Sequence, residues 1–292
     1  MTARRRIWTR VLWGLLVAAL LAGWLGLKVQ PDPFPAARAN PAEPEIVPLP
    51  AGLPAPVDRF YRRTYGEYVP VVTSAVVTGR ATLRPLTPGS LAPGPALPAR
   101  FRFTHEAGQD FRHELEVTWF RRGLLRVDES YLDGVSRQTG PFTTGPLATG
   151  PLGSSESEPQ GAQAANLSLW AEALWFPSLY LTDARVRWEA LDDETAVLSV
   201  PSGTGRERFV VRFDPATGRP FLLEAMRHRD VRTTGKTLWL VRVLAWGEFG
   251  GVTLPRVVAL TWEDEGRPWA VLTAENVAPN VDVRPLLGAP RE

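Results

Sequence analysis

The side chains best suited to chemistry in this sequence are its three histidines, His105, His113 and His228, because the chain has no cysteine. Without cysteine there is no disulfide, no thiolate metal site and no lipidated cysteine anchor. Imidazole can act as an acid, a base or a metal ligand near neutral pH. Any such chemistry therefore depends on which residues the fold brings to these few side chains.

Two segments of alternating apolar and polar residues, 101–105 and 111–119, carry His105 and His113 and predict neighbouring antiparallel strands. If the turn between them centres on Gly108, the two histidines lie diagonally on one face of the pair. This face also carries large apolar side chains, because residues two apart in a strand point to the same side.

A third alternating segment, 125–131, adds Glu129 and Tyr131 to the predicted sheet. If residues 121–123 form a three-residue turn, His113 pairs with Tyr131. The polar side chains that then share one face with Phe111, Val117 and Trp119 are His105, His113, Glu129 and Tyr131.

Two histidines and a carboxylate could form a metal site. The alternative, which we adopt, is that these groups satisfy one another at a cavity rim or a sheet edge, since a one-residue slip of register separates them. We therefore expect no bound metal and no cofactor. The sequence also lacks a phosphate-binding glycine loop, a nucleophile elbow and an HExxH motif, so we expect no enzymatic activity. A hydrolase or metal enzyme that uses His105, His113, Glu129 or Glu172 is the less favoured alternative.

The residues that must surround this face include one strongly predicted helix, residues 166–177, with the sequence NLSLWAEALWFP. Asn166 is expected to cap its N-terminus, and Pro177 ends it because proline has no N–H to donate. Apolar residues occupy nearly all sides of this helix, so it must be wrapped by other elements. Glu172 is its only charged residue. As a buried acid with a raised pKa it could be a general acid or base, whereas the alternative places it on a solvent stripe or beside an arginine.

Most of the remaining chain predicts β-strands, at 71–83, 185–191, 195–201, 206–213, 221–230, 237–249, 253–263 and 268–277. Residues 57–65 add a short helical pattern. The predicted fold is mainly β (α+β), a curved antiparallel sheet or half-barrel wrapped around one or two helices, with an N-terminal transmembrane helix.

Residues 11–27 carry no charge and follow four arginines, which predicts a single-pass signal-anchor with a cytoplasmic N-terminus and an extracytoplasmic domain, periplasmic or on the cell surface. The alternative is a cleaved signal peptide with a processing site at 37–39. The expected organisation is an anchor at 1–28, a proline-rich linker at 29–56, one β-rich domain at 57–284 and a tail at 285–292.

The net charge of +2 includes five positive charges on the N-terminal segment, so residues 29–292 carry −3. A slightly acidic domain argues against a nucleic-acid partner. The expected partners are the membrane and a lipid or another apolar ligand.

Several segments resemble a family of bacterial envelope proteins of unknown function, and the most specific part is Trp175-Phe176-Pro177 followed by Trp188 and Asp192-Asp193. The similar segments are 53–63, 131–134, 171–181, 187–200, 212–220 and 246–255. More distantly, the chain is similar to the outer-membrane lipoprotein carrier and receptor proteins. That resemblance implies a half-barrel closed by helices around an apolar cavity, and a binder of apolar ligands without catalytic residues. The chain departs from them in its long 140–165 segment and its anchor.

These observations predict a membrane-tethered protein that binds an apolar ligand without catalysis. The candidate ligand-binding residues are Leu167, Trp170, Leu174 and Trp188, and the candidate polar residues of the cavity are His105, His113, Glu129, Tyr131 and Glu172. Residues 140–165 are rich in Gly, Pro and Ser and are expected to form a loop that gates the pocket. The alternative is a structural or partner-binding envelope domain with a filled core, and the cavity volume distinguishes the two.

Overall fold

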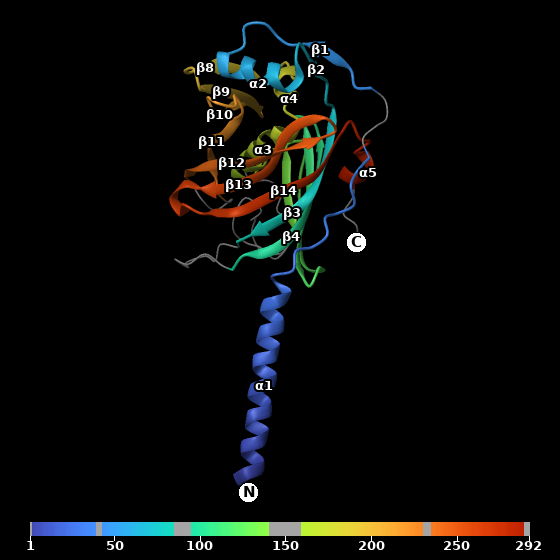
Figure 1. The fold of residues 1–292 in the computed structure, drawn as a ribbon. Coiled ribbons are helices and arrows are strands. Elements are labelled where there is room, and N and C mark those ends of the chain that lie inside the picture. Colours follow the sequence, from blue (N-terminus) through green and yellow to red (C-terminus); the bar gives the residue numbers. More distant parts are fainter. Residues whose placement is uncertain (1, 39–42, 85–94, 140–158, 230–234, 289–292) are drawn as a thin grey trace.

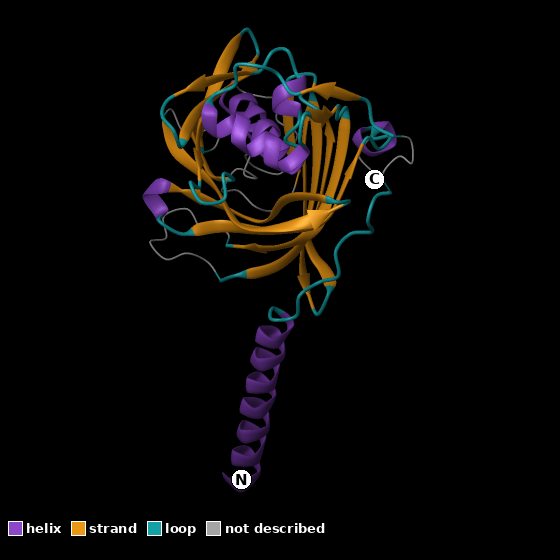
Figure 2. Cartoon of the chain, turned by 45° about the horizontal axis from the view of Figure 1, so that its top comes forward, coloured by secondary structure: helices purple, strands orange, loops and turns teal. Residues whose placement is uncertain are grey.

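A single large antiparallel sheet dominates the computed structural model, which describes residues 2–38, 43–84, 95–139, 159–229 and 235–288 (Figure 1). Its twelve strands are β3 (Ser74–Leu83), β4 (Leu97–Glu106), β5 (Asp110–Trp119), β6 (Arg122–Leu132), β7 (Val135–Thr139), β8 (Arg187–Ala190), β9 (Thr195–Ser202), β10 (Gly205–Phe213), β11 (Pro220–His228), β12 (Lys236–Phe249), β13 (Val252–Trp262) and β14 (Pro268–Pro279). The sheet is strongly curved (Figure 2). The predicted mainly β class and curved antiparallel sheet are confirmed.

The strand order is β7-β6-β5-β4-β3-β14-β13-β12-β11-β10-β9-β8. Each strand of this sheet pairs with the next one in the chain except β7 with β8, and β3 pairs with β14. The two edge strands, β7 and β8, are also consecutive in the sequence. The chain between them contains α3 (Pro159–Glu172), the short helix η1 (Ala173–Trp175) and α4 (Leu179–Thr182). Because this connection crosses from one edge to the other, it brings the helices into the concave side of the sheet (Figure 2).

Helix α3 is enclosed, as its apolar sequence predicts, and every residue from Ala164 to Ala171 is buried. It packs against β6, β7, β9 and β11. The helix starts at Pro159, seven residues before the predicted start, because proline is favoured in a first helical turn where no N–H partner is needed. Asn166 is therefore not an N-cap: its side-chain amide donates to the carbonyl of Pro201 at 3.0 Å.

The predicted gating loop is partly replaced by this earlier helix start, since residues 159–165 are helical. The rest of that prediction, residues 140–158, lies outside the described residues. The Trp175-Phe176-Pro177 turn is held by two buried hydrogen bonds. The indole N–H of Trp175 donates to the carbonyl of Pro255 at 2.9 Å, and the Tyr61 hydroxyl donates to the carbonyl of Pro177 at 2.7 Å.

The hairpin of β5 and β6 differs from its predicted register. Its turn is formed by two residues, Phe120 and Arg121, which both have positive φ (45° and 64°), and a bulge follows between Val117 and Thr118. Two-residue turns of this kind match the twist of the strands, but they usually contain asparagine or glycine. His113 consequently pairs with Glu129 and not with Tyr131. The observed register differs from the predicted one by two residues. Because this shift is even, Glu129 and Tyr131 still lie on the same face of the sheet as His113.

Outside the sheet, α2 (Ala55–Tyr65) matches the short helix predicted at 57–65, and β1 (Ile46–Pro48) pairs with β2 (Tyr68–Pro70). Two further short helices are η2 (Glu263–Glu265) and α5 (Arg284–Leu287). The described parts of the proline-rich segment run along the domain: Phe34 lies 4.5 Å from the guanidinium of Arg100. This segment therefore packs back against the sheet instead of extending as a free spacer.

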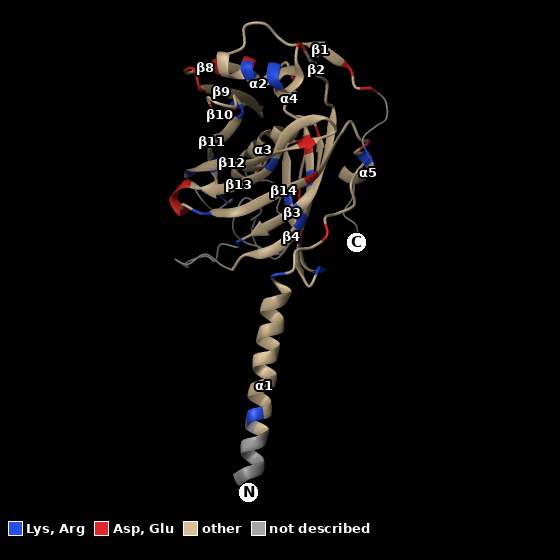
Figure 3. Cartoon of the chain, in the orientation of Figure 1, with Lys and Arg blue, Asp and Glu red and all other residues tan. Residues whose placement is uncertain are grey.

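The N-terminal helix α1 (Thr2–Gly26) extends away from the domain (Figure 1), and beyond Arg10 it carries no charged side chain (Figure 3). Its C-terminal end contacts the β5–β6 turn, where the indole N–H of Trp119 donates to the carbonyl of Gly23 at 3.1 Å and the backbone N–H of Phe120 donates to the carbonyl of Gly26 at 3.1 Å. Among the described residues, no helix combines the length and the apolarity needed to cross a membrane.

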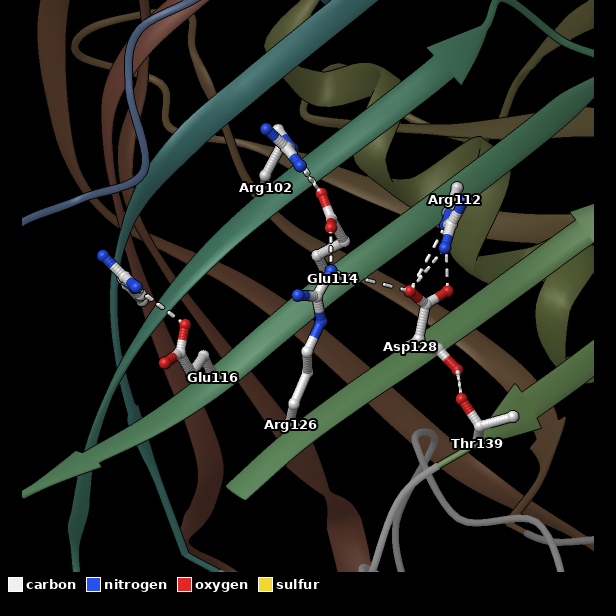
Figure 4. Close-up of polar contacts among 8 residues, drawn as sticks. Arg102, Arg112, Glu114, Glu116, Arg126, Asp128 and Thr139 are labelled. Atoms are coloured by element: carbon white, nitrogen blue, oxygen red, sulfur yellow. Dashed lines mark hydrogen bonds and ion pairs between the residues drawn. The ribbon is translucent and has the colours of Figure 1, made fainter. Parts of the chain in front are cut away.

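The convex face of β4, β5 and β6 carries a row of ion pairs (Figure 4). Glu114 contacts both Arg102 and Arg126, and Asp128 accepts three hydrogen bonds from Arg112 at 2.9, 3.3 and 2.8 Å. These residues alternate along each strand with the buried ones, which places His113 and Glu129 on the opposite, concave face.

Candidate functional site

Ionisable side chains from two sides of the fold meet inside the concave face. His105 lies on β4, His113 on β5 and Glu129 on β6, and Glu172 comes from the last turn of α3. His113 pairs with Phe103 on β4 and with Glu129 on β6, and this register sets the positions of the cluster residues that come from the sheet. The helix half is set by the burial of α3, which turns Glu172 toward the sheet.

The two imidazoles converge on one carboxylate oxygen. Glu172 Oε2 lies 2.7 Å from His113 Nε2 and 3.0 Å from His105 Nε2, and Glu129 Oε2 lies 3.8 Å from His113 Nδ1. The side chains of both histidines are at most 2% exposed, and that of Glu172 is 14% exposed. None of the three converging atoms is hydrogen-bonded, so the ring N–H groups are not aligned with the oxygen although they are close to it.

This proximity produces opposite pKa shifts. Burial lowers the pKa of His113, but the negative charges of Glu172 and Glu129 outweigh it and raise the pKa to about 9. Burial raises the pKa of Glu172, but the two histidines outweigh it and lower the pKa to about 2. For His105, burial dominates over the attraction of Glu172, and its pKa is lowered. At neutral pH the cluster therefore holds an ionised Glu172, a protonated His113 and a neutral His105.

The predicted roles of Glu172 are wrong in two respects. Its side chain lies on no solvent stripe, and its pKa is lowered, not raised, because its partners are histidines. A carboxylate that stays ionised at neutral pH cannot serve as a general acid. Tyr131 is on the predicted face but lies one row further along, against Phe111, with ring centroids 5.9 Å apart. Burial and the charge of Asp110 raise the pKa of Tyr131.

Arg227, which is absent from the residues predicted for the site, lies on β11 across the concave face and is completely buried. Its Nε, Nη1 and Nη2 make no hydrogen bond, and its guanidinium lies 4.3 Å from the ring centroid of Trp239. Burial lowers its pKa to about 10, and Glu129 and Glu172 oppose that shift. The sequence of β11 could have revealed this position. Arg227 is two and four residues after Ala225 and Leu223, which are buried, and residues two apart in a strand point to the same side.

The interior holds little free space next to these groups. One pocket of about 20 Å³ is bordered by seven apolar residues and by His113, Glu129, Ser168, Glu172 and Arg227. A second, also about 20 Å³, and a third, about 10 Å³, lie further along the helical segment. Each has room for about one water molecule. A larger hollow of about 330 Å³ lies at the surface beside α2 and the turn at Thr217 and Gly218.

Of the four candidate ligand-binding residues, two border interior pockets and two lie in the packed core. Leu174 borders two of the interior pockets and Trp188 borders one of them. Leu167 and Trp170 are completely buried in the main apolar core. Trp119, which we placed on the face of the histidines, is 39% exposed and contacts the end of α1 instead.

Fold and site together define a protein with a curved antiparallel sheet, an enclosed helix and a buried ionisable cluster between them. The chain belongs to a family of unknown function, DUF6544, which matches residues 47–274. The family membership predicted from the sequence motifs is thereby confirmed. No curated protein matches the sequence significantly.

Solved structures of similar shape include two proteins with low sequence identity. A LolA superfamily protein from Nitrosomonas europaea is 11% identical, with a TM-score of 0.40, over 76% of this chain and 91% of its own. A DUF1329 family protein from Desulfovibrio piger is 10% identical, with a TM-score of 0.39, over 73% of this chain and 88% of its own.

Proposed function

We propose that this chain is a non-catalytic binding protein for an apolar ligand such as a lipid, held at the outer side of the cytoplasmic membrane by residues 11–27. The observation that carries this proposal is the position of the three interior pockets. All of them border the segment from Ser168 to Tyr180, that is, the end of α3, η1 and α4, on the side that faces the sheet.

One helical segment therefore borders all three pockets, which lie between it and the concave face. In the closed arrangement they are too small for a lipid, because ligand sites usually measure several hundred cubic ångströms. Displacement of the segment from the concave face would join them into one apolar groove, and Leu174, which borders two of them, would lie at its centre. The ligand thus takes the place of packing contacts that the helix makes in the free protein.

The test is a titration of the full chain in detergent with a fluorescent fatty acid. We expect saturable binding at micromolar concentration, lost in Leu174→Arg and retained in Leu244→Arg. Leu244 is the matched control because it is 53% exposed on the same sheet. Circular dichroism and melting curves establish that both variants are folded. If Leu174→Arg does not fold, Leu174→Gln replaces it, with Leu244→Gln as its control.

A second candidate is a structural or partner-binding domain, and the small interior volumes favour it specifically. Close packing is the normal state of protein interiors. Absence of probe binding to the folded wild-type chain would contradict the ligand-binding proposal and leave this candidate. Probe binding that is unaffected by Leu174→Arg would also contradict it, because the groove would not be the site.

The membrane anchor is supported by the uncharged sequence of residues 11–27 and by the exposure of their large apolar side chains. Those more than half exposed in α1 include Leu12, Trp13, Leu15, Leu20, Leu21 and Trp24. Such a surface on an isolated helix needs an apolar environment, which lipid supplies. The anchor would hold the groove close to membrane lipids.

A further inference from the structure

Three potential metal-ligand atoms meet at one point of the interior: His105 Nε2, His113 Nε2 and Glu172 Oε2. All three lie within 4.8 Å of one another, and the carboxylate oxygen is 3.0 and 2.7 Å from the two nitrogens. Each is buried and lies at ion-pair distance from the others without the alignment of a hydrogen bond. Lone pairs that converge on one point in this way are the arrangement that a metal ion requires.

The type of these atoms indicates which metal ion fits. Two imidazole nitrogens and one carboxylate oxygen form the ligand set of a tetrahedral Zn²⁺ site with three protein ligands and one open position. A water molecule could occupy the open coordination position, because the pocket beside His113 and Glu172 measures about 20 Å³, which is room for about one water molecule.

A supporting group is also present. Glu129 Oε2 lies 3.8 Å from Nδ1 of His113, the ring nitrogen that faces away from Glu172. Metal-binding histidines commonly have a carboxylate at their second nitrogen, which fixes the tautomer and orients the ring. Glu129 and Glu172 together supply two negative charges against the charge of a divalent ion.

We propose that His105, His113 and Glu172 bind one divalent transition-metal ion of the Zn²⁺ class, with a water molecule from the adjacent pocket as the fourth ligand. This assignment departs from our expectation from the sequence that no metal is bound. It goes beyond the proposed binding of an apolar ligand but shares a pocket with it, so displacement of the helical segment would also separate Glu172 from the two histidines. The alternative is a metal-free cluster in which the protonated His113 alone balances Glu172.

The test begins with the full chain purified in detergent, without a polyhistidine tag and without chelators. We expect about one equivalent of metal by elemental analysis, and, after its removal, saturable Co²⁺ binding with the visible absorption of a four-coordinate site. Zn²⁺ should displace the Co²⁺ and raise the melting temperature. His113→Gln and Glu172→Gln should lose both effects, whereas His228→Gln should keep them, because His228 lies outside the site.

The wild-type measurement alone can overturn the proposal, even if the site variants fail to fold. Folded wild-type chain that neither retains metal, nor binds Co²⁺ at pH 8, nor gains thermal stability from Zn²⁺ has no such site. Binding that persists in folded His113→Gln, or that is lost in His228→Gln, would place the metal elsewhere and equally refute the assignment.

Discussion

Raising the pH from 6.5 to 9 should destabilise the metal-free protein through His113. The ordinary pKa of this imidazole is 6.5, and in the folded state it is raised to about 9. Because the folded state holds the proton more tightly, its contribution to stability is complete below pH 6.5 and disappears as the pH approaches 9. One pKa unit corresponds to about 1.4 kcal/mol, so the loss is on the order of 3 kcal/mol.

The other groups of the cluster should contribute little in this interval. The pKa of Glu172 is about 2, and that of Arg227 is about 10. The pKa of His105 is lowered by burial, the opposite shift to that of His113, so its titration cannot cause a loss of stability as the pH rises. The predicted loss of stability therefore belongs to His113 alone among these residues.

The assay is urea unfolding in the presence of a chelator, followed by tryptophan fluorescence at pH 6.5, 7.5 and 9. The free energy of unfolding should fall over this series in the wild type and in His228→Gln, and should change much less in His113→Gln. An equal free energy at pH 6.5 and 9 in the wild type would refute the reasoning. So would an undiminished loss in His113→Gln, because the titrating group would then be another one.

Four further outcomes follow from the same structure. Trp170→Ala should reduce the free energy of unfolding by about 3–5 kcal/mol, because the indole is completely buried; an unchanged melting curve would contradict its place in the core. Arg227→Met should leave the free energy of unfolding at pH 7 unchanged or raise it, because burial lowers the pKa of Arg227 by more than Glu129 and Glu172 raise it; a large loss in urea unfolding would contradict this balance. Arg126→Ala, which removes a 49% exposed partner from the convex ion pairs, should cost less than about 1 kcal/mol in urea unfolding. N-terminal sequencing of membrane-bound protein should find the anchor still attached, and a mature N-terminus at Asn40 would show that it is cleaved.

The sequence by itself determined the class of the fold and most of its strands. Alternation with period two depends only on neighbouring residues, and it identified β9, β10 and β12 within a few residues of their ends. The burial of α3 could also be predicted from its sequence, because a helix without a polar face has to be covered by other elements. The short edge strand β7 was not, since five residues carry too few alternations to distinguish a strand from a loop.

The tertiary structure alone decided how the site is assembled. Strand parity placed His105, His113 and Glu129 on one face, but the exact pairing depended on a turn in which Phe120 and Arg121 adopt positive φ, a conformation their residue types do not favour. The rotation of α3, which turns Glu172 toward both histidines, is set by packing on all its sides. Arg227 enters from a strand far away in the sequence because the sheet curves. Sequence spacing fixes the face on which a side chain lies, whereas the distances between faces are fixed by curvature and packing, which involve the whole chain.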